Sequence, residues 1–219
     1  MTNEAEIIER GIIELGASVS REQVASLLSY LTILETTNQS FNLTRIPRSD
    51  YATLHILDSL TALIIIPNKS ALRILDIGTG AGFPGVPLAC VLPHAQVTLL
   101  DSTAKKVRFA ADTAHHCGIR NCLGIHARAE TLAKDPEHRA RYDVVISRAV
   151  ASFDRLVRLM MPLVAPGGIA LALKGAKAEE ELVGTDVLVR SLGGAPAQIH
   201  TVTIPGSDIV RNLIVVQKH

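Results

Sequence analysis

The first part of the chain repeats its apolar residues at the spacing of amphipathic helices. Isoleucine, valine and leucine recur three and four positions apart between residues 3 and about 36, and Gly16 interrupts the pattern. Ser20 is followed three positions later by Gln23, which has the form of a capping box. We therefore expect two helices here, the second beginning at Ser20.

A polar loop and a third helix follow. Residues 38–50 are mostly polar, which is typical of a loop, and residues 50–65 show a further helical pattern that stops before Pro67. We expect residues 1–67 to form a helical N-terminal extension and residues 68–219 to form the main domain.

Beyond Pro67, short apolar runs alternate with helical segments. Strands that alternate with helices are joined by right-handed crossovers, and they form a mainly parallel sheet covered on both faces. The last two runs are separated only by a short turn around Gly206, so we expect an antiparallel hairpin at one edge. The expected fold is α/β, with a doubly wound, Rossmann-like, seven-stranded sheet. The expected strands are residues 72–78, 97–101, 122–126, 142–147, 168–174, 197–204 and 212–217.

A glycine-rich turn follows the first expected strand. Asp76 ends the strand, and Gly78, Gly80 and Gly82 come next. Glycine allows a backbone to turn tightly and to approach a ligand where a Cβ would collide. Ligands of open parallel sheets bind beside such turns, beyond the carboxyl ends of the strands. The turn predicts a nucleoside or nucleotide site, with Asp101 at the end of the next strand as the partner of ribose hydroxyls.

Two features favour S-adenosyl-L-methionine over a dinucleotide at this turn. The Asp76 carboxylate suits the ammonium group of an amino-acid tail and is unfavourable beside a pyrophosphate. Pro84 and Pro87 remove amide donors from the first turn of the next helix, where dinucleotide sites hold phosphate. A nicotinamide-dependent oxidoreductase and a turn without a ligand are the alternatives.

Composition and charge narrow the class of protein. The 219 residues have a formal net charge of +1, so affinity for nucleic acid has to come from a local patch. Residues 105–148 hold nine Lys or Arg against five Asp or Glu, which permits such a patch. The three cysteines lack Cys-x-x-Cys spacing, so we expect neither a disulfide framework nor a metal site. Without a signal peptide or a long apolar run, the protein is expected in the cytoplasm.

Basic residues end two of the expected strands at the ligand edge. Arg148 follows the fourth strand and is the first choice for a residue that meets both donor and target. The alternative for Arg148 is an ion pair with Asp76 or Asp101. Lys174 ends the fifth strand, where its ammonium group is expected to contact a base oxygen or a phosphate, or to be solvated.

Other polar residues have two readings each. Arg128 lies beside Glu130, so an ion pair between them competes with RNA contact. His55 is either packed or functional, and Asn42 is either a turn cap or functional. The glutamates at 179–181 are expected to be a solvated helix start.

A basic run opens the helix after Asp101. Lys105, Lys106 and Arg108 form either a solvated face or a contact to an RNA backbone. A contact to an RNA backbone predicts binding that weakens as the salt concentration increases.

Several segments, in order along the chain, resemble a known family. They are FNLT (41–44), HILDS (55–59), DIGTGAGFPG (76–85), LLDSTAKKVRF (99–109), ARAE (127–130), ISRAVA (146–151) and LKG (173–175). Over residues 28–218 the chain resembles the bacterial 16S ribosomal RNA guanine-N7 methyltransferase G family, once called glucose-inhibited division protein B. The resemblance implies a class I methyltransferase fold and methyl transfer from S-adenosyl-L-methionine to N7 of one guanine in the small ribosomal subunit. For the oligomeric state, a monomer is the simplest expectation. A small-molecule methyltransferase of the same superfamily is the alternative.

The resemblance also implies roles for individual residues. The implied donor contacts are Gly78, Phe83, Ala129, Glu130 and Arg148, with Asp101 on the ribose. The implied substrate-facing residues are Asn42, His55, Arg128, Lys174 and Arg211. The chain departs from the family at residues 37–40, where a Trp and Asn-Lys are usual, and at Ala81, which replaces a common Pro.

The chemistry implied for N7 agrees with what the sequence lacks. N7 of guanine has a free lone pair, so methyl transfer to it needs alignment and no general base, and alignment alone can lower a barrier by roughly 7–11 kcal/mol. Methylation of an exocyclic amine usually draws on Asn or Asp followed by Pro-Pro and an aromatic residue, whereas Ser147 and Arg148 stand here. Methylation at pyrimidine C5 needs a cysteine nucleophile, and Cys122 begins its strand at the wrong edge.

Overall fold

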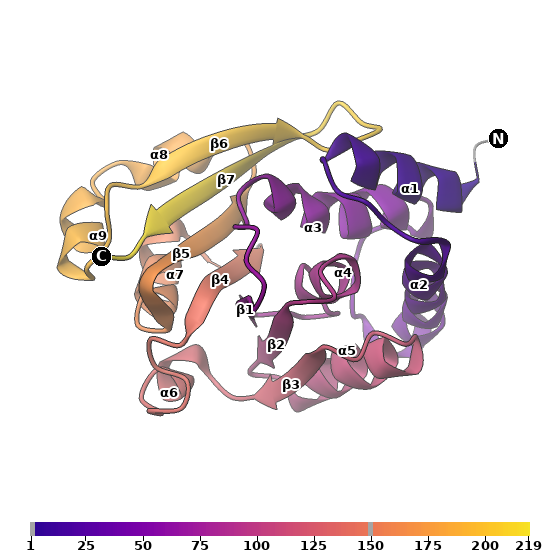
Figure 1. The fold of residues 1–219 in the computed structure, drawn as a ribbon, viewed down its shortest axis with the longest axis horizontal. Helices are drawn as coiled ribbons and strands as arrows, with labels where there is room; N and C mark the ends of the chain where they lie inside the picture. The colour runs from indigo at the N-terminus through magenta and orange to yellow at the C-terminus, as the bar shows by residue number, and fades with distance from the viewer. Residues whose placement is uncertain (1–2, 149–150) are drawn as a thin grey trace.

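Seven strands form one mixed sheet in the order β3-β2-β1-β4-β5-β7-β6. The computed structural model describes residues 3–148 and 151–219. The first five strands pair in parallel, and β7 is antiparallel to both β5 and β6. The expected doubly wound sheet with an antiparallel edge hairpin is thereby confirmed (Figure 1). The strands are β1 (Arg73–Ile77), β2 (Gln96–Asp101), β3 (Cys122–His126), β4 (Tyr142–Arg148), β5 (Val164–Lys174), β6 (Gln198–Thr203) and β7 (Val210–Gln217).

The fifth strand starts earlier than the sequence predicts. It begins at Val164 and not at residue 168, so it includes Pro166 and two glycines that interrupt the apolar pattern. The register with β4 shifts between Tyr142 and Val144, which accommodates the extra residues as an irregularity in the ladder.

The helices around the sheet begin and end largely where their sequence signals lie. Capping boxes at Asn3 and Ser20 open α1 and α2, and the second is the one that the sequence predicts. The expected third helix is a run of short 3₁₀, π and α segments, with the π segment over Ala52–Leu57. The helices are α1 (Glu4–Glu14), α2 (Arg21–Phe41), η1 (Arg48–Asp50), η2 (Ala52–Leu57), α3 (Asp58–Leu60), η3 (Thr61–Ile64), α4 (Gly85–Val91), α5 (Ala104–His116), α6 (Ala129–Leu132), α7 (Phe153–Met160), α8 (Ala178–Leu182) and α9 (Asp186–Ser191).

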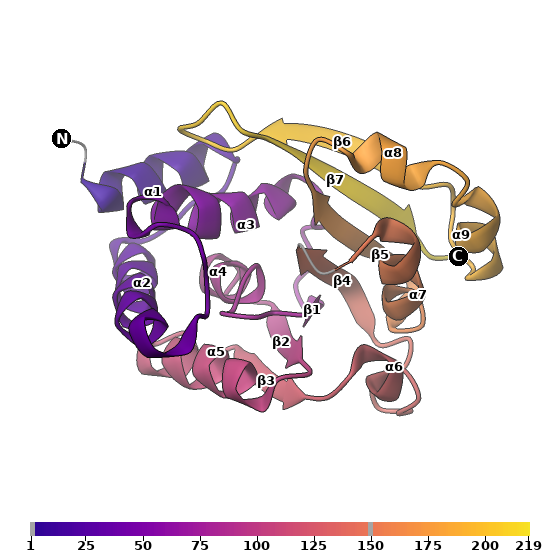
Figure 2. The ribbon, with the colours of Figure 1, turned by 180° about the vertical axis from the view of Figure 1, so that it is seen from behind.

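Alternate residues of each strand face different sets of helices. Ile74 of β1 belongs to the core shared with α1, α2, α4 and α5, whereas Leu75 belongs to the core shared with α6 and α7. Figure 2 shows the helices of the first set on one side of the sheet. Because side chains alternate along a strand, residues an even number of positions apart point to the same side of the sheet, and direct neighbours point to opposite sides. This odd or even position, the parity of a residue, decides toward which set of helices a side chain at a strand end points.

The N-terminal helices pack directly on the sheet. Ile8 and Ile12 of α1 and Leu27, Leu31 and Leu34 of α2 are fully buried in the same apolar core as β1 and β2. The division of the chain at residue 67 stays a prediction. Among the described helices, none is long and apolar enough to cross a membrane.

Candidate functional site

Two adjoining clefts lie beyond the carboxyl ends of the parallel strands. The first cleft, of about 380 Å³, lies next to β2 and α6, and the second, of about 420 Å³, lies between the glycine turn and the helical segments at residues 52–58. Gly78, Gly80 and Arg148 line both. The two clefts therefore meet at the glycine turn.

The conformation of the glycine turn explains its sequence. Gly78 and Gly80 have φ values of 73° and 55°, which side chains rarely tolerate. The Gly80 amide donates to Asp101 Oδ2 at 3.1 Å, and the Thr103 amide donates to Asp101 Oδ1 at 2.8 Å. These bonds hold the Asp101 carboxylate at the wall of the first cleft, as a ribose contact requires.

Asp76 lies beneath the turn and lines neither cleft. It has the parity of Ile74, so its side chain points to the α4 side of the sheet, where its Oδ2 accepts from the Gly85 amide at 2.9 Å. Its Oδ1 is buried and has no hydrogen-bond partner among the described residues. Complete burial raises the pKa of the Asp76 carboxyl to about 7, although the Gly85 amide opposes this rise. The structure thus shows no direct access from Asp76 to an ammonium group in the cleft.

The raised pKa of Asp76 predicts a specific pH dependence of stability. Between pH 3.8, its ordinary pKa, and about 7, the folded protein keeps a proton that the unfolded chain releases. The free energy of unfolding therefore falls as pH rises through this window, on the order of a few kcal/mol. Urea unfolding across the window should show this fall in the wild type and a flatter profile for Asp76→Asn. Parallel profiles for the two proteins would contradict a buried, protonated Asp76.

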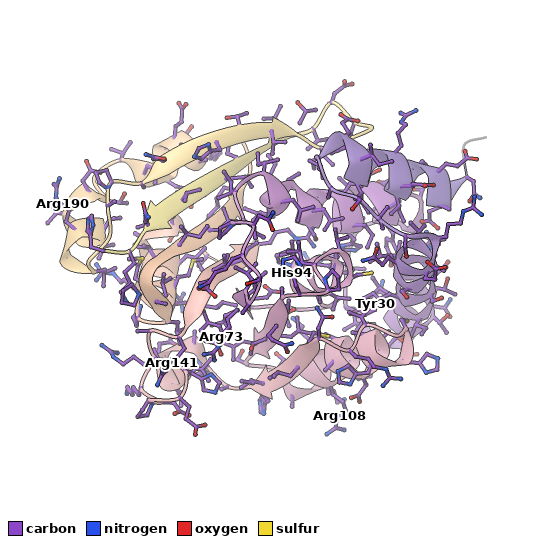
Figure 3. The ribbon with its side chains drawn as sticks, viewed as in Figure 1. Tyr30, Arg73, His94, Arg108, Arg141 and Arg190 are labelled. Carbon is purple, nitrogen blue, oxygen red and sulfur yellow. The ribbon has the colours of Figure 1, made fainter. Side chains whose placement is uncertain are left out.

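A tyrosine of the N-terminal extension anchors the glycine turn. Tyr30 is labelled in Figure 3 and is fully buried. Its hydroxyl donates to the Ala81 carbonyl at 2.8 Å. A Cβ at Gly82 would lie 2.3 Å from this hydroxyl, so Gly82 serves the close packing of α2 on the turn and lines neither cleft. Sequence reasoning missed Tyr30, whose one signal is a phenol within the apolar stripe of a helix.

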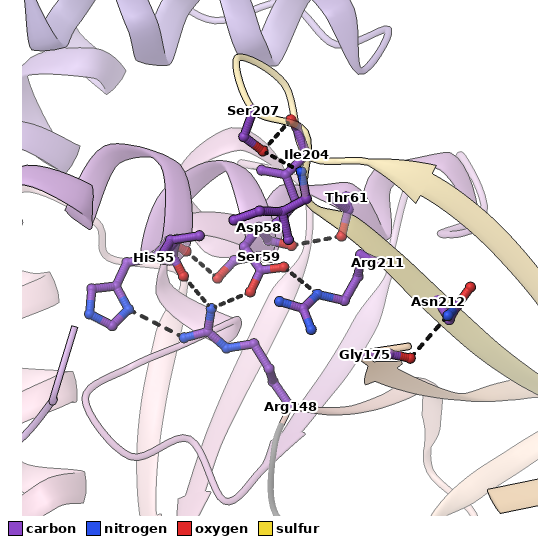
Figure 4. Close-up of polar contacts among 12 residues, drawn as sticks. His55, Asp58, Ser59, Thr61, Arg148, Gly175, Ile204, Ser207, Arg211 and Asn212 are labelled. Carbon is purple, nitrogen blue, oxygen red and sulfur yellow. Dashed lines mark hydrogen bonds and ion pairs between the residues drawn. The ribbon is translucent and has the colours of Figure 1, made fainter. Parts of the chain in front are cut away.

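A carboxylate that the sequence did not single out organises the second cleft. Asp58 Oδ2 accepts from Arg148 Nη1 at 2.8 Å, and Asp58 Oδ1 accepts from Arg211 Nε at 2.6 Å (Figure 4). Arg148 Nη1 also donates to the Leu54 carbonyl. The three side chains are 3%, 13% and 19% exposed for Asp58, Arg148 and Arg211. Asp58, not Asp76 or Asp101, is the carboxylate that pairs with Arg148.

His55 is a neutral member of this group. Arg148 Nη2 lies 3.3 Å from His55 Nδ1, and since a guanidinium only donates, Nδ1 must accept. We therefore assign the proton to Nε2, which lies 3.0 Å from Thr44 Oγ1. Burial, with the charge of Arg148, lowers the pKa of His55 to about 3. Its ring stacks on Phe83 with centroids 4.3 Å apart, so His55 is both packed and part of the cleft wall.

The first cleft collects the residues at the end of β3. Ala129 and Glu130 begin α6, and with Arg128 they line this cleft together with Asp101. Lys106 lines it from α5. No ion pair between Arg128 and Glu130 is present among the described residues.

Two expected substrate residues lie outside both clefts. Lys174 is buried on the α7 and α8 side of the sheet, where its Nζ contacts Glu181 Oε2 at 2.7 Å and the Ala151 carbonyl. Glu181 also accepts from the Phe153 amide, so it is not the solvated residue that the sequence predicts. Asn42 is the C-cap of α2, with φ 46°, and is exposed. Lys174 is thus paired within the fold and Asn42 ends a helix, and neither of them lines a cleft.

The described residues of the first cleft suit a nucleoside. No group of three or more His, Cys, Asp or Glu side chains that could hold a metal ion occurs within residues 3–148 and 151–219. The first cleft offers an amide-held carboxylate at Asp101, the glycine turn and an acidic residue at Glu130. The two carboxylates suit hydroxyls and an amino group.

The strand order, with clefts beyond the carboxyl ends of the parallel strands, is that of a class I methyltransferase fold. A predicted O-methyltransferase from Agrobacterium tumefaciens has a TM-score of 0.55 and 22% identity, over 74% of this chain and 79% of that chain. The 16S rRNA (adenine(1408)-N(1))-methyltransferase of Catenulisporales acidiphilia, solved as a variant with its cosubstrate SAM, has a TM-score of 0.52 and 17% identity, over 68% and 87% of the two chains. These likenesses concern the fold alone.

The sequence comparisons are more specific. The family described as rRNA small subunit methyltransferase G matches residues 23–211. The ribosomal RNA small subunit methyltransferase G of Pelotomaculum thermopropionicum is 38% identical over 98% of this chain and 90% of that protein. The chain belongs to the rRNA small subunit methyltransferase G family.

Proposed function

We propose that this protein transfers a methyl group from S-adenosyl-L-methionine to N7 of a guanine in 16S ribosomal RNA. The observation that carries the proposal is the meeting of two clefts at Gly78, Gly80 and Arg148, in a chain of the rRNA small subunit methyltransferase G family. One cleft holds Asp101 and Glu130 for a nucleoside donor, and the other holds Arg211 beside the stacked pair of His55 and Phe83. Methyl transfer requires two reactants that meet at one point.

The first cleft is the proposed donor site. Asp101 would accept from ribose hydroxyls, Gly78 and Gly80 allow close approach of the turn, and Ala129 and Glu130 line the same cleft. When bound, S-adenosyl-L-methionine supplies an electrophilic methyl carbon on a sulfonium. The buried Asp76 carboxylate supports the turn through Gly85 and holds no ligand itself in this arrangement.

The second cleft is the proposed guanine site. Arg211 donates to Asp58 through Nε, which leaves its two terminal amino groups for acceptors on a base or phosphate. Phe83 and His55 form a stacked pair in the cleft wall. Arg148, at the junction, is the residue that would meet both reactants.

The surroundings of the second cleft suit an atom that needs no deprotonation. Asp58 is the one acidic residue among the described residues that line it, and arginines occupy both of its oxygens. His55 already accepts at Nδ1. Burial raises the pKa of the Cys122 thiol to about 11, and Cys122 lines neither cleft. N7 of guanine, which carries a free lone pair, fits a site without a base or nucleophile.

Membership of the family supports the proposed substrate. We propose that the enzyme acts on 16S ribosomal RNA or the small subunit, as a monomer in the cytoplasm. Asn42, Arg128 and Lys174 have no contact that assigns them to the reaction, and only Arg128 lines a proposed site. Our proposal therefore places Asn42 and Lys174 in support of the fold.

The direct test is to locate the methyl group. Small subunits that lack the modification, incubated with the protein and labelled S-adenosyl-L-methionine, should gain one label, and cleavage specific for 7-methylguanine should map it to a single position of 16S rRNA. Calorimetry should show binding of S-adenosyl-L-methionine and none of NAD. Label at another base or atom, or binding of NAD in place of the methyl donor, would refute the proposal.

A further inference from the structure

An exposed groove beside the clefts combines an aromatic ring with two cations. Phe41, the last residue of α2, is 43% exposed, and Lys105 Nζ lies 4.7 Å from the centre of its ring. Arg108, Phe109 and Asp112 of α5 line the same groove. Arg108 extends away from α5 into solvent (Figure 3). The groove thus offers a stacking surface flanked by positive charge.

The cations of this groove are not neutralised by carboxylates in the described part of the chain. Within the described ranges 3–148 and 151–219, no ion pair engages Lys105, Lys106 or Arg108. The first turn of α5 contains no acidic residue, and Asp112 is the one carboxylate among the described residues of the groove. Exposed cations without carboxylate partners attract phosphate. The local charge therefore complements a nucleic acid although the net charge of the chain is only +1.

The groove is lined by α5 and by the end of α2, and each of these segments adjoins one of the two clefts. Lys106 lines the first cleft, while its neighbours on α5 line the groove. On the other side, one residue separates Phe41 from Leu43, which lines the second cleft. That residue, Asn42, has a φ of 46° and turns the chain sharply between the two sites. Because Leu43 comes two residues after Phe41, their Cα atoms are at most about 7 Å apart, so a nucleotide near one in the second cleft is within reach of the groove.

We propose that this groove binds a nucleotide near the target guanine in the substrate RNA, with its base against Phe41 and its phosphate at Lys105 and Arg108. Unstacked bases of single-stranded RNA are commonly held on aromatic side chains, with cations along the backbone. The flexible Lys105 ammonium can leave the ring for the phosphate as the base stacks. The inference rests on the proposed function and assigns a subsite outside the two clefts.

Phe41→Leu tests the stacking contact, because leucine keeps the apolar bulk against α5 and removes the ring. With unmethylated small subunits as the varied substrate, we expect the KM of Phe41→Leu to rise about 5- to 100-fold. The affinity for S-adenosyl-L-methionine, measured by calorimetry, should not change. Val187→Leu, at a site on α9 that is 73% exposed, is the control for an apolar change on the surface.

The charges are tested separately. The plot of log affinity against log salt concentration has a negative slope, and Lys105→Ala and Arg108→Ala should each reduce its magnitude by about 0.7. This is the value for one phosphate contact on a single strand. Arg190→Ala, which removes a cation at the opposite end of the molecule, should leave the slope unchanged (Figure 3). Equal slopes for all three variants would overturn the phosphate contact.

The outcomes separate this inference from the proposed function. If the wild type methylates 16S rRNA and Phe41→Leu has the same KM, the groove is no RNA subsite and the proposed function stands. If the wild type does not methylate 16S rRNA, the proposed function itself fails. Sedimentation of the wild type and of Phe41→Leu tests whether the groove binds a second copy of the protein in place of RNA. A difference in mass between the two would show that the groove joins two protein molecules and would overturn the RNA contact.

Discussion

Replacing Arg148 by alanine is expected to lower kcat for methylation of small subunits by about 10²- to 10³-fold, the usual cost of one preorganised donor in an active site. Arg148 is the one charged side chain among the described residues that lines both clefts. Its guanidinium is fixed by Asp58, the Leu54 carbonyl and His55, so its position does not depend on the substrate. Such a group aligns the two reactants without reorganisation.

Single-turnover methylation and donor calorimetry measure this effect. Arg148→Ala should remain folded by circular dichroism, because Arg211 still neutralises Asp58. Arg148→Lys, which keeps the charge and loses the planar fork, should recover only a small part of the rate. A variant that methylates at the wild-type rate would exclude Arg148 from the reaction. A loss of donor binding as large as the loss of kcat would place it with the donor alone.

The fold could be predicted from the sequence because its signals are local. The capping box at Ser20, the apolar runs and the short turn at Gly206 specify two helices, the strands and the edge hairpin without knowledge of long-range contacts. The predicted bounds of helices and strands were less accurate where the structure departs from the apolar pattern. The segment at residues 48–64 is a composite of 3₁₀, π and α turns, and β5 continues back through Pro166.

The positions at strand ends show why the site was predicted only in part. Arg148 pairs in register with Leu173, and paired residues of parallel strands point to the same side. Lys174 is one residue further on, so its side chain points to the other side, where Glu181 receives it. The alternation was visible in the sequence, but its register with β4 was not. Asp76 differs from Lys174 in this respect, because it pairs in register with Ile146 and so points to the same side as Arg148. It is buried beneath the glycine turn, where it accepts from the Gly85 amide, and the apolar pattern does not indicate this burial.

The contacts that order the second cleft were beyond sequence reasoning. Asp58 and Arg211 are 153 positions apart in the chain, and their ion pair depends on β7 lying beside β5 in an antiparallel register. Nothing local marks Asp58 as different from any other acidic residue in a helix. The resemblance to a family supplied Arg211 and His55 as candidates, and the structure supplied the carboxylate that joins Arg211 to Arg148.

Asp58→Ala is expected to cost both stability and activity. Removing one member of a buried ion-pair group leaves unpaired charge, which typically costs about 3–5 kcal/mol. Here the two arginines would repel each other at the centre of the second cleft, since Asp58 is 3% exposed and bonds both. Asp58→Asn keeps a carbonyl acceptor, so it should unfold less easily than Asp58→Ala and serves as the folded variant for kinetics.

A double-mutant cycle separates the two consequences. The loss in free energy of unfolding in Asp58→Ala/Arg211→Ala should be smaller than the sum of the single losses, because Arg148 is then the one cation left without Asp58, in place of two unpaired arginines that repel each other. Donor affinity should remain close to wild type in Asp58→Asn, since Asp58 lines only the second cleft, while methyl transfer falls as Arg148 loses its anchor. Additive stability losses would show that Asp58 and Arg211 act independently. If Asp58→Asn kept full activity, the fixed position of Arg148 would not be what aligns the reactants.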